Sequence, residues 1–188
     1  MRAGEEAGLM VLPGMELTAA EEVHVVCLFP ALENAMDFDG YVHGCLPDID
    51  NVPEIFGAQQ ILDRRDEPAG IEQKLLINAT TIEISDLPAL VKGYGGFCYP
   101  AHIDRASNSV LSNLGFIPPE CAFRTLEVAD PEAFFADGRN QAYKEGYAIV
   151  TSSDAHYLEN ISEREHCIHL DTVDFEGCLL YTSDAADE

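Results

Sequence analysis

Basic residues are scarce in this sequence, because ten Lys and Arg stand against 34 Asp and Glu and give a formal net charge of −24. Only three of the ten are lysines, namely Lys74, Lys92 and Lys144. A protein that follows a nucleic-acid backbone needs a stripe of positive charge, and the sequence contains none. We therefore expect that long nucleic acid is not a partner. The acidic excess favours a solvated surface of the kind found in salt-adapted organisms.

Long apolar runs are also absent, since no stretch of the sequence reaches the about 18 residues that predict a membrane-spanning helix. No basic segment followed by an apolar one opens the chain, so no signal peptide is expected. The six cysteines form no C-x-x-C pair, which gives no support to a structural zinc knuckle. Scattered cysteines in an enzyme-like chain favour reduced thiols and a cytoplasmic protein without a membrane partner.

Residues that can bind a metal follow several apolar runs. The run 147–150 leads to Asp154 and His156, which would point the same way on an extended backbone. The run 97–101 ends at His102, and the run 9–15 ends at Glu16, with His24 in the next apolar segment. Carboxylate and imidazole groups together suit a divalent transition metal. Strands that each end in such a residue predict a barrel-like α/β enzyme with its site at the strand ends.

These segments carry a resemblance to a known family. The stretches 13–16, 22–25, 100–105 and 152–156 are similar, in order and spacing, to motifs of the PHP (polymerase and histidinol phosphatase) family along residues 8–177. The likeness is greatest to stand-alone bacterial members. It implies a metal-dependent phosphoesterase on a distorted (β/α)7 TIM-like barrel, with up to three divalent ions, Mn, Fe or Zn. It also implies the metal ligands Glu16, His24, His102, Asp154 and His156.

The sequence departs from the family at both ends. The family's first motif, a His-x-His at the end of the first strand, has no counterpart here. We therefore expect a partial barrel that lacks its first βα units and is inactive by itself, although a short variant with an altered site is the alternative. Residues 178–188 resemble a translated sequencing adapter, which leaves 1–177 as the PHP domain. Residues 48–70 read as an insertion with a short hairpin, either a lid or a loop without function.

Each candidate residue also has a simpler interpretation. Glu16 could bind backbone amides in a turn, and His24 could point outward from an alternating strand. Arg105 could bind a substrate phosphate through two hydrogen bonds, or it could pair with a neighbouring carboxylate. Glu127 and Asp130 lie at another strand end and are weaker candidates for a supporting role. No side-chain nucleophile is needed, because a metal-activated water can attack phosphorus.

The sequence thus predicts a metal-dependent phosphoesterase that acts on a small phosphorylated metabolite or nucleotide. The alternative is a non-catalytic metal-binding or regulatory domain on the same fold. Retention of several metal-capable residues favours the enzyme. A last strand is expected at 167–170, and helices are expected at 30–46 and 131–145. The sequence does not specify the substrate or the oligomeric state.

Overall fold

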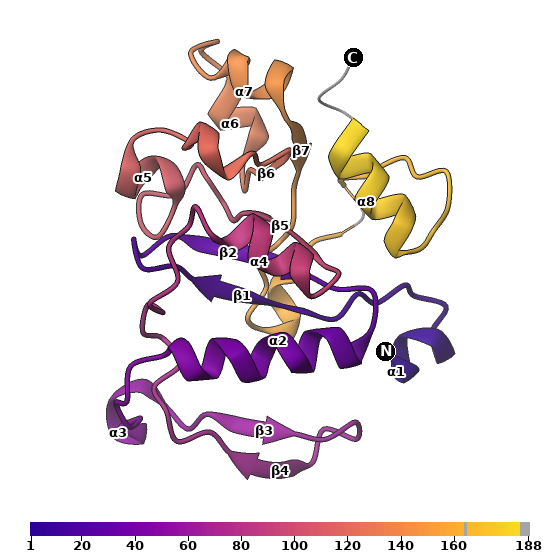
Figure 1. Cartoon of the computed structure of the whole chain (residues 1–188). Coiled ribbons are helices and arrows are strands. Elements are labelled where there is room, and N and C mark those ends of the chain that lie inside the picture. The colour runs from indigo at the N-terminus through magenta and orange to yellow at the C-terminus, as the bar shows by residue number, and fades with distance from the viewer. Residues whose placement is uncertain (164, 185–188) are drawn as a thin grey trace.

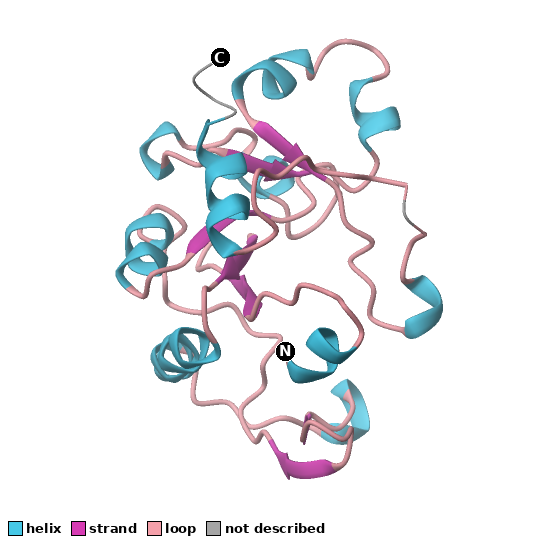
Figure 2. Ribbon diagram, turned by 90° about the vertical axis from the view of Figure 1, so that its right-hand side faces the viewer, coloured by secondary structure: helices cyan, strands magenta, loops and turns pink. Residues whose placement is uncertain are grey.

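The strands lie in separate small sheets joined by helices and long loops (Figures 1 and 2). The computed structural model describes residues 1–163 and 165–184. Its strands are β1 (Gly14–Thr18), β2 (His24–Leu28), β3 (Gln60–Leu62), β4 (Pro68–Ile71), β5 (Phe97–Pro100), β6 (Thr125–Glu127) and β7 (Ala148–Val150). Its α-helices are α1 (Arg2–Glu6), α2 (Leu32–Cys45), α3 (Pro53–Phe56), α4 (Leu87–Gly93), α5 (Val110–Leu114), α6 (Pro131–Phe135), α7 (Gln141–Gly146) and α8 (Phe175–Asp184). Short 3-10 helices span Pro119–Cys121 and Leu158–Asn160.

The first sheet has the strand order β1-β2-β5, and both of its pairings are antiparallel. Only residues 19–23 connect β1 to β2, where Ala19 and Val23 close the turn by a backbone hydrogen bond of 2.9 Å. Such a short connection can only reverse the chain, since a parallel crossover needs about a dozen residues or more. The strand that carries Glu16 and the strand that carries His24 therefore run in opposite directions.

The expected partial (β/α)7 TIM-like barrel, with parallel strands throughout, is wrong for the residues that the structure describes. Strands pair in sheets of three, two and two, and none of these sheets closes on itself. Parallel pairing occurs between β6 and β7, whose connection contains α6 and α7 as a parallel crossover requires. The sequence-based argument assumed that all the strands were parallel. Apolar runs alone do not distinguish parallel strands from antiparallel ones.

Helix α2 covers one face of the first sheet and supplies much of the core. Its buried residues Ala35, Phe38 and Val42 recur at the helical spacing of three to four, which places them on one face. The ring of Phe38 lies 5.0 Å from the ring of Phe29, between centroids, just beyond the end of β2. The expected helix at 30–46 is present, with slightly shorter bounds.

A short antiparallel hairpin of β3 and β4, as expected within residues 48–70, lies beyond α2 from the sheet (Figure 1). Polar contacts fix the segment that follows it to the end of α2. Lys74 Nζ donates hydrogen bonds to the carbonyl oxygens of His43 and Leu46, at 3.1 and 3.4 Å. His43 lies in the last turn of α2 and Leu46 is its C-cap residue, where carbonyl groups run out of helical N–H partners, so Lys74 acts as a cap.

The other end of the chain departs from expectation. No strand forms at 167–170, and the expected helix at 131–145 is two short helices, α6 and α7. Helix α8 contains part of the adapter-like segment, and Phe175 at its start packs its ring 5.4 Å from that of Phe97. Residues 185–188 of that segment lie outside the described residues. Among the described helices, none combines the length and apolar character that a membrane crossing requires.

Candidate metal centre

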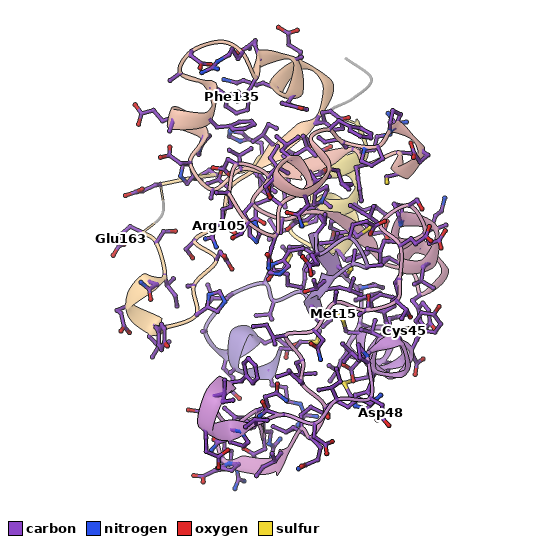
Figure 3. All side chains as sticks on the ribbon, turned by 90° about the vertical axis from the view of Figure 1, so that its left-hand side faces the viewer. Met15, Cys45, Asp48, Arg105, Phe135 and Glu163 are labelled. Atoms are coloured by element: carbon purple, nitrogen blue, oxygen red, sulfur yellow. The ribbon has the colours of Figure 1, made fainter. Side chains whose placement is uncertain are left out.

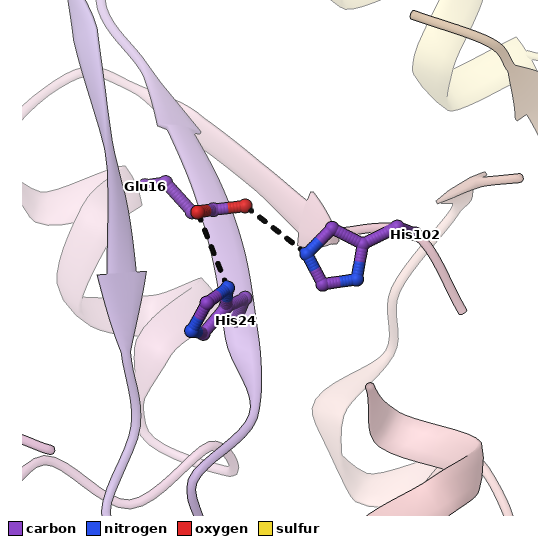
Figure 4. Close-up of side chains that lie close together, drawn as sticks. All are labelled: Glu16, His24 and His102. Atoms are coloured by element: carbon purple, nitrogen blue, oxygen red, sulfur yellow. Dashed lines mark ion pairs between the residues drawn. The ribbon is translucent and has the colours of Figure 1, made fainter. Parts of the chain in front are cut away.

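Glu16, His24 and His102 converge on one side of the first sheet (Figure 4). His24 pairs with Thr18 across β1 and β2, and Glu16 lies two residues before Thr18 on the same face. Glu16 and His24 are therefore diagonal neighbours, a separation that long side chains bridge. His102 follows the end of β5, which pairs with β2 on its other side. The antiparallel sheet brings the three residues together from separate parts of the chain.

The carboxylate of Glu16 lies between the two imidazoles. Its Oε2 is 3.2 Å from His24 Nδ1, and its Oε1 is 3.4 Å from His102 Nε2. The imidazole rings meet edge to face, with 5.3 Å between their centroids. One ligand atom from each residue lies within 4.8 Å of the others, so a single divalent ion could contact all three.

The electrostatics of this group favour an ionised carboxylate. The imidazoles of His102 and His24, each with a nitrogen close to the carboxylate, hold the pKa of Glu16 well below its usual range. Burial of His102 lowers its pKa, but the hydrogen bond and negative charge of Glu16 outweigh burial and raise the pKa overall. The carboxylate is thus already in the state that a cation requires, whereas His102 must lose any bound proton to bind a metal.

Unpaired nitrogen atoms support the fit to a metal. The side chain of His102 is only 3 % exposed, and its Nδ1 has no hydrogen-bond partner among the described residues. Nδ1 of His24 is also buried and makes no hydrogen bond there, although it lies near Glu16. An ion between the three side chains would bind the nitrogen atoms that face Glu16, Nδ1 of His24 and Nε2 of His102. It would remove the cost, about 1–3 kcal/mol, of leaving the buried His24 Nδ1 unsatisfied. Together with the mixed His and carboxylate set, these atoms fit a divalent ion.

Glu127 holds His102 in an unusual backbone conformation. The φ angle of His102 is 30°, in the left-handed region that residues other than glycine avoid. Glu127 Oε2 accepts the backbone N–H of His102 at 3.3 Å, and the Glu127 carbonyl accepts the N–H of Ile103 at 2.8 Å. The Glu127 carboxylate is buried and also accepts the Ser152 hydroxyl. The sequence marked Glu127, near the end of an expected strand at 123–128, only as a weak candidate for a supporting role.

Asp154 and His156 lie near this group, but not on an extended backbone. Asp154 has a φ of 46°, so the alternation that would point both side chains the same way is broken. His156 is 73 % exposed, and its Nδ1 lies 3.0 Å from the backbone oxygen of Asp154. Asp154 instead pairs with Arg105, whose Nη1 is 2.8 Å from Oδ2. Metal binding by Asp154 and His156 therefore stays a prediction.

Asn108 contacts His24 from two sides, and the sequence did not single it out. Its side-chain amide lies 2.8 Å from His24 Nε2, and its backbone carbonyl accepts the His24 N–H at 2.8 Å. Asn108 itself has a φ of 55°, which asparagine tolerates better than most residues. The residue lies in a Ser-Asn-Ser loop with no metal-binding signature, so its role depends on the fold.

One open cavity of about 430 Å³ joins the centre to the ends of β6 and β7. Figure 3 shows Arg105 and Met15 between Phe135, near the top of the view, and Asp48, lower down. The cavity is lined by Glu16 together with Val26, Leu28, Glu127, Ser152, Asp154 and His156, among others. The predicted ligands Glu16, Asp154 and His156 therefore face a common space, whereas Asp130 lines a different cavity.

No family model and no curated protein sequence matches this chain. Among solved structures, the fold is similar to that of the novel lesion-specific endonuclease PfuEndoQ from Pyrococcus furiosus, with a TM-score of 0.56 and 15% sequence identity. The match covers 89% of this chain but only 37% of the endonuclease. At this identity the likeness shows a shared fold.

This neighbour corrects the expectation about partners. An endonuclease acts on nucleic acid, so a fold of this kind does not exclude long nucleic acid as a partner. The exclusion relied on the net charge of −24, which is a sum over the whole chain. A bound divalent ion is often the largest local charge in a site and can attract phosphate in an acidic protein.

Proposed function

We propose that this chain carries the metal centre of a hydrolase that acts on phosphoric esters. The convergence of Glu16, His24 and His102 within 4.8 Å is the observation on which the proposal depends. The resemblance to PHP motifs implies the same reaction class. The structural neighbour is named an endonuclease, which also cleaves a phosphoric ester, and its likeness supports a PHP-like fold.

Residues of the chain have distinct roles in this proposal. Glu16, His24 and His102 would hold the ion, with Asp154 and His156 as further candidate ligands across the shared cavity. A divalent ion bound there supplies a Lewis acid for phosphoryl oxygens and lowers the pKa of water. Mn, Fe and Zn all accept this mixture of ligands, and up to three ions would match the family resemblance.

Arg105 and Glu127 position the groups around the ion. The side chain of Arg105 is 45 % exposed and its guanidinium pairs with Asp154 at the cavity, so Arg105 is placed to meet an anionic substrate from solvent. Glu127 is buried, fixes the backbone of His102 and orients Ser152. Neither residue needs to change its protonation state for these tasks.

The ester could be that of a phosphorylated metabolite or a nucleotide, and the structural neighbour adds nucleic-acid phosphodiesters. The alternative to an enzyme is a non-catalytic metal-binding domain on this fold. The cavity of about 430 Å³ beside the centre favours an enzyme, because binding sites for small molecules have volumes of this order.

The test combines metal binding with hydrolysis. The purified chain is titrated with Mn²⁺ by isothermal calorimetry and then assayed on an aryl phosphate monoester, a bis-aryl phosphodiester and a single-stranded oligonucleotide. Mn²⁺-stimulated hydrolysis that is lost in Glu16→Gln supports the proposal. Binding that needs Glu16, without hydrolysis of any of the three esters, is expected both of the non-catalytic alternative and of a partial centre that lacks the family's His-x-His residues. Failure to bind Mn²⁺ or Zn²⁺ contradicts both.

A further inference from the structure

Cys27 and Cys98 occupy directly opposite positions on β2 and β5. The kind of pairing follows from the backbone. Ala101 donates its N–H to the carbonyl of His24 at 3.0 Å, which makes that pair a hydrogen-bonded one. Pairs alternate along an antiparallel ladder, so Pro100, one residue earlier, falls at a non-hydrogen-bonded position where its missing N–H costs nothing. Two residues further on, Cys27 and Cys98 form the next non-hydrogen-bonded pair.

This position suits a disulfide bond between the two cysteines. Residues in a non-hydrogen-bonded pair have Cα atoms about 4.5 Å apart, with their side chains on the same face. Disulfides join Cα atoms about 4.4–6.8 Å apart, so Cys27 and Cys98 fall at the short end of that range. Both thiols are free in the structure. Their hydrogen bond, followed by burial, raises the pKa of Cys27, which keeps that thiol protonated.

The two thiols differ in how well they can be reached. Cys27 is completely buried in the core. Cys98 is only partly buried, and it lines an open cavity of about 480 Å³ on the side of the sheet away from Glu16. Two of the chain's ten basic residues, Lys92 and Arg124, line the same cavity. An accessible thiol in positively charged surroundings, with a second thiol behind it, is the arrangement of cysteines that respond to oxidants.

We propose that Cys98 and Cys27 form a peroxide-sensitive thiol pair, a modification site separate from the metal centre. The Cys98 sulfur attacks one oxygen of hydrogen peroxide, the O–O bond breaks, and the second oxygen leaves as water. Sulfur is oxidised by two electrons to a sulfenic acid, and the peroxide is reduced. The Cys27 sulfur then bonds to the Cys98 sulfur, and the hydroxyl group leaves as water with the Cys27 proton.

The test is peptide mapping by mass spectrometry under non-reducing conditions, after the purified chain has been treated with hydrogen peroxide. The expected product is a peptide pair linked through Cys27 and Cys98, which dithiothreitol separates again. Cys27→Ser should lose this pair and instead gain a dimedone adduct at Cys98. Cys167→Ser, which changes an exposed cysteine, is the matched control and should keep the linked pair.

Other outcomes overturn the proposal. One is a wild-type chain in which Cys98 stays reduced while Cys167 is oxidised. Another is a disulfide between Cys98 and Cys121, the buried neighbour whose thiol contacts the carbonyl of Ile84 at 3.7 Å. The same experiment on Glu16→Gln separates this site from the metal centre, because the linked pair should form there equally well. Wild-type mapping remains decisive even if Cys27→Ser fails to fold.

Discussion

Asn108 holds His24 through both its side chain and its backbone, with each contact at 2.8 Å. The side-chain contact is to Nε2 and leaves Nδ1 directed at Glu16. Residues that bind the second nitrogen of a metal-binding histidine fix its tautomer and orientation. In the structure the amide nitrogen of Asn108 lies at Nε2. A histidine that binds an ion through Nδ1 carries its proton on Nε2, so the Asn108 amide would turn its oxygen to that nitrogen in the metal-bound state.

Substitutions at Asn108 can test the contact of its side chain without adding strain to its backbone. Glycine adopts the φ of 55° freely, so Asn108→Gly removes the amide without adding strain. We expect about 10- to 100-fold weaker Mn²⁺ binding in Asn108→Gly by calorimetry. Asn108→Asp, which keeps an acceptor oxygen, should bind the ion at least as well as the wild type. Equal affinity in Asn108→Gly and the wild type would show that Asn108 does not position His24.

Asp154 and Arg105 form an ion pair at 2.8 Å, and their substitutions should have different effects. If Asp154 binds an ion, Asp154→Asn should weaken metal affinity by about 10-fold or more, with folding intact by circular dichroism. Arg105→Ala should leave metal affinity unchanged and mainly raise KM, if it binds phosphate equally in ground and transition states. The same loss of metal affinity in both variants would mean that the pair is structural.

The core prediction concerns α2. Phe38 is fully buried against Phe29, so Phe38→Ala should lower the free energy of unfolding by about 3–5 kcal/mol. Met36 lies on the same helix and is 58% exposed, so Met36→Ala should change the free energy of unfolding by less than about 1 kcal/mol. Urea unfolding followed by circular dichroism measures both. Similar losses of unfolding free energy in the two variants would mean that α2 does not face the core through Phe38 as the structure has it.

Local patterns in the sequence singled out Glu16, His24 and His102, and the structure brings these three side chains together. His102 follows the end of β5 as expected, whereas Glu16 is the middle residue of β1 and not the end of a strand. The spacing of the first two apolar segments already argued against a barrel, because residues 19–23 are too few for a parallel crossover, and the sequence-based prediction did not use this. The prediction that Asp154 and His156 point the same way on an extended backbone was wrong, because nothing in the local sequence indicates the positive φ of Asp154.

Tertiary contacts account for what the sequence could not show. Asn108 reaches His24 across 84 residues of chain, and Glu127 reaches the backbone of His102 across 25. Neither spacing is a motif. The exclusion of nucleic acid failed because a net charge of −24 does not describe the local field at a metal centre.

The most direct test of the central claim is a crystal structure of the chain soaked in Mn²⁺, with anomalous diffraction data. The metal centre inferred here predicts an anomalous peak within bonding distance of Glu16, His24 and His102. The peak should vanish in crystals of Glu16→Gln, whose amide removes the charge that holds the ion. No peak among these three side chains in wild-type crystals, or an unchanged peak in Glu16→Gln, would contradict the claim.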